Sequence, residues 1–134
     1  MHEINYWAVL AAGVANIVVS FSWYHPRFFG KSWMAEANMS PAQVEQGKAS
    51  MRRNIFLALA AGVVAAYVLN YFGIAWGVYD VLGAIELGFW AWLGFTAVPM
   101  LGMVLWEQKS LRYYAIVSGG WLVSFIVMSL VLLI

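Results

Sequence analysis

The chain has 134 residues, of which 64% are hydrophobic and only 10% are charged, whereas a soluble domain averages about 25% charged residues. A soluble domain of this size cannot bury so much apolar surface, so the composition predicts a single-domain membrane protein. The formal net charge of +1 gives no electrostatic case for a nucleic-acid partner, and the lack of cysteine excludes disulfides, thiolate nucleophiles and cysteine-based zinc sites.

Four apolar segments are long enough to cross a hydrocarbon core, which needs about 20 helical residues. They cover residues 5–24, 54–74, 81–106 and 113–134. Apolar runs of this length do not fit the short alternating strands of a membrane barrel. The predicted fold is therefore all-α, an antiparallel four-helix transmembrane bundle.

The segment SWYHPRFFGKSW, residues 22–33, ends the first span. Aromatic rings favour the membrane interface, cations contact anionic headgroups, and Pro26 disfavours helix in the residue before it. A membrane anchor explains these features, but Gly30 also permits a re-entrant corner packed against a later connection. The residues assigned to this corner are Trp23, Tyr24, Pro26, Arg27, Gly30, Lys31, Trp33 and Glu107.

Residues 25–53 form a connection too long for a simple turn. A short interfacial helix is expected over residues 31–37. Ser40, Pro41 and Gln43 then have the spacing of a capping box with proline at the first helical position. No strong breaker follows, so the sequence predicts one helix from Pro41 to Phe72, with span two extended into the cytoplasm.

All seven cations lie in the connections between spans one and two and between spans three and four. The positive-inside rule places these connections in the cytoplasm and both termini outside it, as expected for a bacterial inner (plasma) membrane protein. Glu107, in the second connection, is hypothesised to pair with Arg27, Lys31 or Arg53.

Helices in lipid associate through small residues and polar contacts. Small residues at intervals of four predict the packing faces, which comprise Ala8, Ala12, Ala58, Gly62, Ala66, Gly94, Gly102 and Gly120. In the third span Pro99 is expected to kink the helix and free the carbonyl of Phe95, with the Thr96 hydroxyl as a replacement partner for the local backbone.

Three polar side chains within the spans are candidates for a ligand site or a polar path: Asn16, Asn70 and Glu86. Interhelical hydrogen bonds are the simpler role for the two amides. A carboxylate inside a membrane suggests proton coupling or cation binding, but Glu86 is also close enough to the span's end to reach headgroup water. His2 and His25 are predicted on opposite membrane faces, so no metal site is expected.

The residues NYWAVLAAGVANIVVSFSWYHPRFFGKSWM, with WLGFTAVPMLGMVLWE and the final SGGWLVSFIVMSLVLLI, resemble the DUF1761 family of small membrane proteins. The W-Y-x-P and F-G-K-x-W-M pattern of that family matches residues 23–26 and 29–34. His25 occupies the variable position of the first pattern, where a small residue is expected. The resemblance implies four spans and no known activity.

No nucleotide-binding loop, catalytic triad or metal motif occurs, so neither an enzyme nor a cofactor is predicted. The expected role is an accessory subunit or homo-oligomeric binding module whose partners are membrane lipid and another protein chain. A small oligomeric transporter or channel using Asn16, Asn70 and Glu86 is the alternative. A lipid- or quinone-modifying enzyme at the aromatic corner is a third hypothesis.

Overall fold

The structure, a computed structural model, describes residues 1–134 and is helical throughout, without strands. Four helical segments are long and apolar enough to cross a membrane: α1 (Tyr6–Trp23), α4 (Met51–Ala75), the segmented Val81–Leu105, and α8 (Leu111–Val131). They coincide with the four predicted spans to within a few residues. The prediction of an all-α, four-span membrane protein is confirmed.

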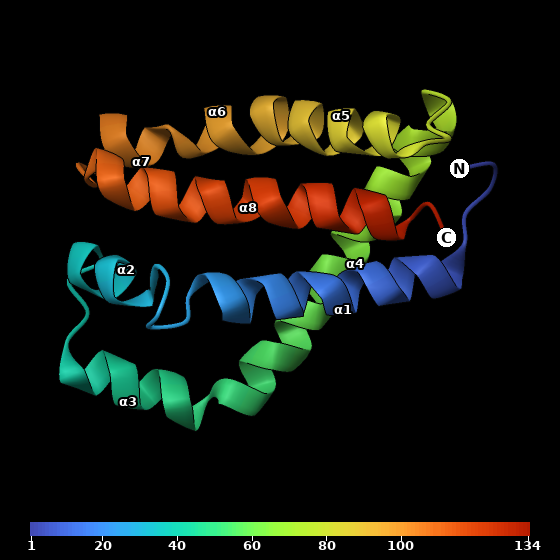
Figure 1. The fold of residues 1–134 in the computed structure, drawn as a ribbon. Helices are drawn as coiled ribbons and strands as arrows, with labels where there is room; N and C mark the ends of the chain where they lie inside the picture. Colours follow the sequence, from blue (N-terminus) through green and yellow to red (C-terminus); the bar gives the residue numbers. More distant parts are fainter.

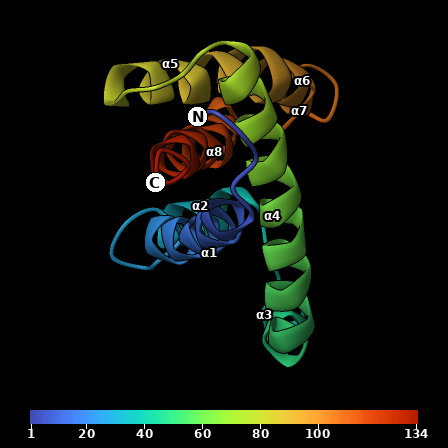
Figure 2. The same cartoon turned by 90° about the vertical axis from the view of Figure 1, so that its right-hand side faces the viewer.

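Three of the spans form a layer, and the fourth crosses it. Figure 1 shows α1, α8 and the third span side by side, with α8 in the middle and antiparallel to both neighbours. Figure 2 shows α4 passing along one side of this layer, and Figure 1 shows that it crosses the other helices obliquely. The core between them consists of small and aliphatic side chains, including Ala12, Ala66, Ala84, Leu87 and Met128, each at most 1% exposed.

The third span is interrupted near its proline. It consists of α5 (Val81–Trp92), the π-helical η1 (Leu93–Ala97), α6 (Val98–Met100) and α7 (Gly102–Leu105). Pro99 has no backbone N–H to donate, and a wider π turn precedes it. In this turn the Val98 amide donates to the carbonyl of Leu93, five residues earlier. A hydroxyl does form a hydrogen bond with the backbone of this stretch, but it is that of Tyr114 in α8, which donates to the Ala97 carbonyl at 2.6 Å. The expected donor was the Thr96 hydroxyl.

The long connection contains α2 (Gly30–Glu36) and α3 (Pro41–Ala49). The capping box is present. The Gln43 backbone amide donates to Ser40 Oγ, and the Gln43 side-chain oxygen accepts from the Ser40 backbone amide. The prediction of one helix from Pro41 to Phe72 is wrong, because Ser50, with φ −95° and ψ 8°, separates α3 from α4. No residue of α3 is buried, so little packing energy holds it in line with α4, and α3 turns away (Figure 1).

Small residues pack the bundle, but not all of those expected. Ala8, Ala12, Gly62, Ala66 and Gly120 are buried. Ala58 and Gly94 are exposed, and a Cβ on Gly94 would meet nothing within 4 Å, while one on Gly102 would meet only the Trp106 side chain.

The close contact of the third span lies instead at Gly88, where a Cβ would approach the Ile126 backbone to 2.8 Å. Ala84 and Ala91 lie on the same buried face of α5. Gly94 is six residues beyond Gly88, which places it on another side of a helix with 3.6 residues per turn.

Candidate functional site

All seven Lys and Arg residues lie at one end of the bundle, which we call the basic end. It comprises the C-terminus of α1, helices α2 and α3, the start of α4, and the connection into α8 with the first residues of α8. The cations are Arg27, Lys31, Lys48, Arg52, Arg53, Lys109 and Arg112. The opposite end has Glu3 and Asp80 but no Lys or Arg side chain.

The turn after α1 forms a tight corner. The Phe29 amide donates to the Trp23 carbonyl at 3.1 Å, and the Gly30 amide donates to the His25 carbonyl at 3.2 Å. A Cβ on Gly30 would lie 2.2 Å from the Tyr24 carbonyl oxygen. Gly30 is thus required by the close approach of two backbone segments; it does not have the positive φ angle for which glycine is usually selected.

The corner is attached to α8 through Trp23. Its indole Nε1 donates to the Ile116 carbonyl at 2.8 Å, and its ring lies 4.4 Å, centroid to centroid, from that of Phe29. A Cβ on Gly120 would reach the indole at 3.0 Å, so this glycine makes room for the ring. The corner therefore determines where α1 ends relative to α8.

A second aromatic pair completes the corner. The rings of Tyr24 and Trp33 meet edge to face with centroids 5.2 Å apart. Tyr24 lies one residue beyond the first span, and burial raises the pKa of its phenol, with a smaller contribution from Tyr113. The contact of Tyr24 with the corner is therefore made by its ring, and its hydroxyl stays protonated at neutral pH.

Glu107 does not pack against this corner. Its side chain is exposed and forms no ion pair, because the one salt bridge of the chain joins Lys48 and Glu45 at 3.4 Å. The proposed pairing with Arg27, Lys31 or Arg53 is therefore wrong. The carboxylate that joins the two basic-end connections is Glu36, which accepts a hydrogen bond from Ser110 Oγ at 2.5 Å.

Groups suited to catalysis do not converge at the corner. A groove beside it is lined by Trp23, Phe28, Phe29, Ser32 and Arg112 among others, but not by His25 or Glu107. Pro26 and Arg27 are exposed, and the Arg27 amide donates to His25 Nδ1 at 3.1 Å. No three His, Asp or Glu side chains come together in the arrangement that a metal ion needs.

The three polar residues of the spans are not brought to one place. Asn16 and Asn70 are buried between helices, whereas Glu86 is exposed on the outward side of α5. The Asn16 Nδ2 atom would lie 2.9 Å from a Cβ on Gly62, and its Oδ1 atom is buried without a hydrogen-bond partner. Within one chain these residues line no common path.

Asn70 has a structural partner that sequence reasoning missed. Its Oδ1 accepts from the Asn5 amide at 3.1 Å, while the Asn5 side chain caps α1 through the Ala8 amide and donates to the Ile134 carbonyl at 3.3 Å. The N-terminal ammonium group also donates to the Val78 carbonyl. Asn5 precedes the first apolar run, which is a recognisable N-cap signal, but its long-range contacts carry no such signal.

The chain matches the model of one protein family, described as "Protein of unknown function (DUF1761)", over residues 7–133. The chain belongs to the DUF1761 family. The match covers all four spans and the aromatic corner, in agreement with the resemblance of the sequence. No curated protein and no solved structure matches the chain. The description of the DUF1761 family names no activity.

Proposed function

We propose that this protein is a non-enzymatic membrane component that associates with a second transmembrane chain. That chain is either a second copy of this protein or a subunit of a larger complex, in which this protein is an accessory subunit. The observation that carries the proposal is the position of Glu86. This carboxylate lies on the outward face of a membrane span and has no partner within the chain.

The outward face of α5 is otherwise apolar. Phe89, Trp90 and Leu93 are exposed beside Glu86, whereas Ala84 and Leu87 face the core. Glu86 lies six residues after Asp80, the N-cap of α5, which is about 9 Å along the helix. A carboxylate facing lipid is costly, and ionisable groups within spans normally face protein. A hydrogen-bond donor on an associated chain would remove that cost.

Because the chain has no cysteine, single-cysteine variants can test this association. Leu93→Cys lies on the Glu86 face, and Val18→Cys provides an exposed control on α1. In native membranes a reagent with one thiol-reactive group and one photoactivatable group should give a dimer from Leu93→Cys if the partner is a second copy, or an adduct of another mass if it is a different protein. The additional change Glu86→Leu should alter that yield. No adduct, or equal adducts at both positions, would contradict the proposal.

We also propose that both termini lie outside the cytoplasm, in a bacterial inner membrane. The clustering of every Lys and Arg at the basic end supports this orientation through the positive-inside rule. A reporter that is active only in the cytoplasm should be inactive when fused after Ile134 and active when inserted in the connection around Asn38. The reverse pattern would overturn the orientation without affecting the association.

A further inference from the structure

We propose that the groove between α1 and α4 at the basic end binds an anionic phospholipid, with an acyl chain between the helices and the headgroup beside Arg53. The groove exists because α4 crosses the layer obliquely. The two helices touch near Gly13, where a Cβ would lie 2.7 Å from the Val63 side chain, and they separate toward the basic end (Figure 1).

The groove is shaped for an apolar chain. Its volume is about 390 Å³, within the range of about 300–1,000 Å³ typical of small-molecule sites. Ile17 and Phe21 of α1 line one side, Ile55 and Ala58 of α4 line the other, and the rings of Tyr24 and Trp33 close the basic end. Six of the eight lining residues are hydrophobic, and the groove is open at the surface between two membrane-spanning helices.

Its rim is positively charged. Asn54 lines the groove, and the Arg53 Nη2 atom donates to Asn54 Oδ1 at 3.5 Å, which places a guanidinium group at the rim. Arg27 and Lys31 belong to the turn and helix that carry Tyr24 and Trp33. No acidic residue lines the groove, and none of these three cations forms an ion pair within the chain. The charge therefore complements a phosphate group attached to an acyl chain.

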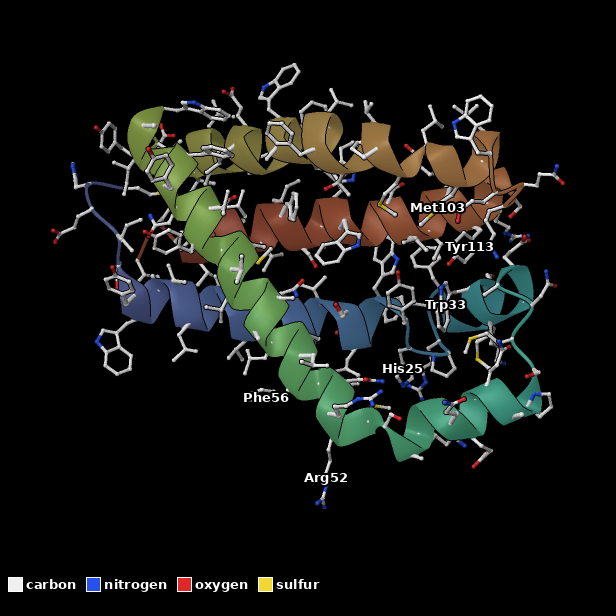
Figure 3. All side chains as sticks on the ribbon, turned by 180° about the vertical axis from the view of Figure 1, so that it is seen from behind. His25, Trp33, Arg52, Phe56, Met103 and Tyr113 are labelled. Atoms are coloured by element: carbon white, nitrogen blue, oxygen red, sulfur yellow. The ribbon has the colours of Figure 1, made fainter.

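The neighbouring arginine provides a contrast. Figure 3 shows Arg52 projecting away from the bundle, and no hydrogen bond joins its side chain to Asn54 or to another residue that lines the groove. The two side chains are equally basic and adjacent in sequence, so Arg53→Gln and Arg52→Gln form a matched pair. On α4, Ala58 lines the groove and Ala60 lies on the opposite side, and both are exposed, so Ala58→Phe and Ala60→Phe form a second matched pair.

The test is native mass spectrometry of the purified full chain in detergent with added phosphatidylglycerol or phosphatidylcholine. The wild-type chain should retain phosphatidylglycerol preferentially. Ala58→Phe should reduce retention at least about tenfold, the equivalent of about 1.4 kcal/mol, and Ala60→Phe should not. Arg53→Gln should abolish the preference between the two lipids, whereas Arg52→Gln should preserve it. Equal retention of both lipids by the wild type, or equal effects within either pair, would overturn the assignment.

A second measurement does not depend on any variant folding. Phosphatidylglycerol with a photoactivatable group on its acyl chain, mixed with the wild-type chain in vesicles, should label peptides containing Phe21 and Ile55. Labelling spread evenly over the outward faces of α5 and α8 would show ordinary annular lipid and would refute a site in this groove.

Discussion

The Cα of Gly30 lies so close to the Tyr24 carbonyl oxygen that a Cβ would approach it to 2.2 Å, and both partners are backbone. Neither can move without opening the corner that joins α1 to α2. Gly30→Ala should therefore destabilise the protein by about 3 kcal/mol, the upper range for overpacking. The midpoint of unfolding by sodium dodecyl sulfate measures this change. Gly47→Ala in α3, where a Cβ meets nothing within 4 Å, should be neutral or slightly stabilising. Equal midpoints for both variants would contradict the described corner.

Trp23→Phe should cost about 1 kcal/mol, because it removes the indole donor and leaves the Ile116 carbonyl without its side-chain partner. Trp7 and Trp106 are each 82% exposed, so their change to Phe supplies controls with the same chemistry and little expected effect. Unfolding followed by circular dichroism suits this comparison, since tryptophan fluorescence would change in every variant. Similar losses at all three positions would indicate a general effect of removing tryptophan and no specific bond.

The two buried amides should respond differently to the same substitution. Asn70→Leu removes the acceptor of the Asn5 amide and should destabilise the chain by about 1–2 kcal/mol. Asn16→Leu replaces a side chain whose buried oxygen has no partner, and it should be nearly neutral or stabilising. Unfolding midpoints of the two variants provide the comparison. A larger loss at Asn16 than at Asn70 would reverse the roles described above.

Glu36→Ala should loosen the basic end. The Glu36 carboxylate contacts the connection into α8 through its hydrogen bond with Ser110. Ser110 Oγ also caps α8, because it accepts from the Tyr113 backbone amide at 3.0 Å. Loss of about 1 kcal/mol corresponds to about fivefold faster amide hydrogen exchange in residues 30–36. Glu107→Ala, which removes an exposed carboxylate without partners, should leave this exchange unchanged. Faster exchange in both variants would point to net charge as the cause.

The spans and the capping box could be predicted because each depends on local sequence. A run of about 20 apolar residues is sufficient to define a span, and Ser40 with Gln43 satisfies helix-end groups without help from other segments. The break at Ser50 could not be predicted in this way. Whether a helix continues past a serine depends on what packs against each half, and no residue of α3 is buried.

Contacts between distant segments were the least predictable part. Glu36 and Glu107 are both acidic residues near basic connections, and only the folded arrangement shows that Glu36 reaches Ser110. Small residues were recognised as packing positions, but four-residue spacing does not say which face of a helix meets its neighbour. In the third span this spacing predicts contacts at Gly94 and Gly102, whereas the close contact is at Gly88. The candidate lipid groove follows from the crossing of α4, which no pattern in the sequence indicates.

The oblique crossing of α4 also relates the protein to bilayer thickness. The 18 residues of α1 extend about 27 Å and the 25 residues of α4 about 37 Å, against a hydrocarbon core of about 30 Å. When α4 is tilted, its greater length fits within the same hydrocarbon core as a more upright α1. In a thicker bilayer hydrophobic mismatch favours a more upright α4, which would bring its first half toward α1 and narrow the space between Phe21 and Ile55. The capacity of that space is thereby coupled to the membrane that surrounds it.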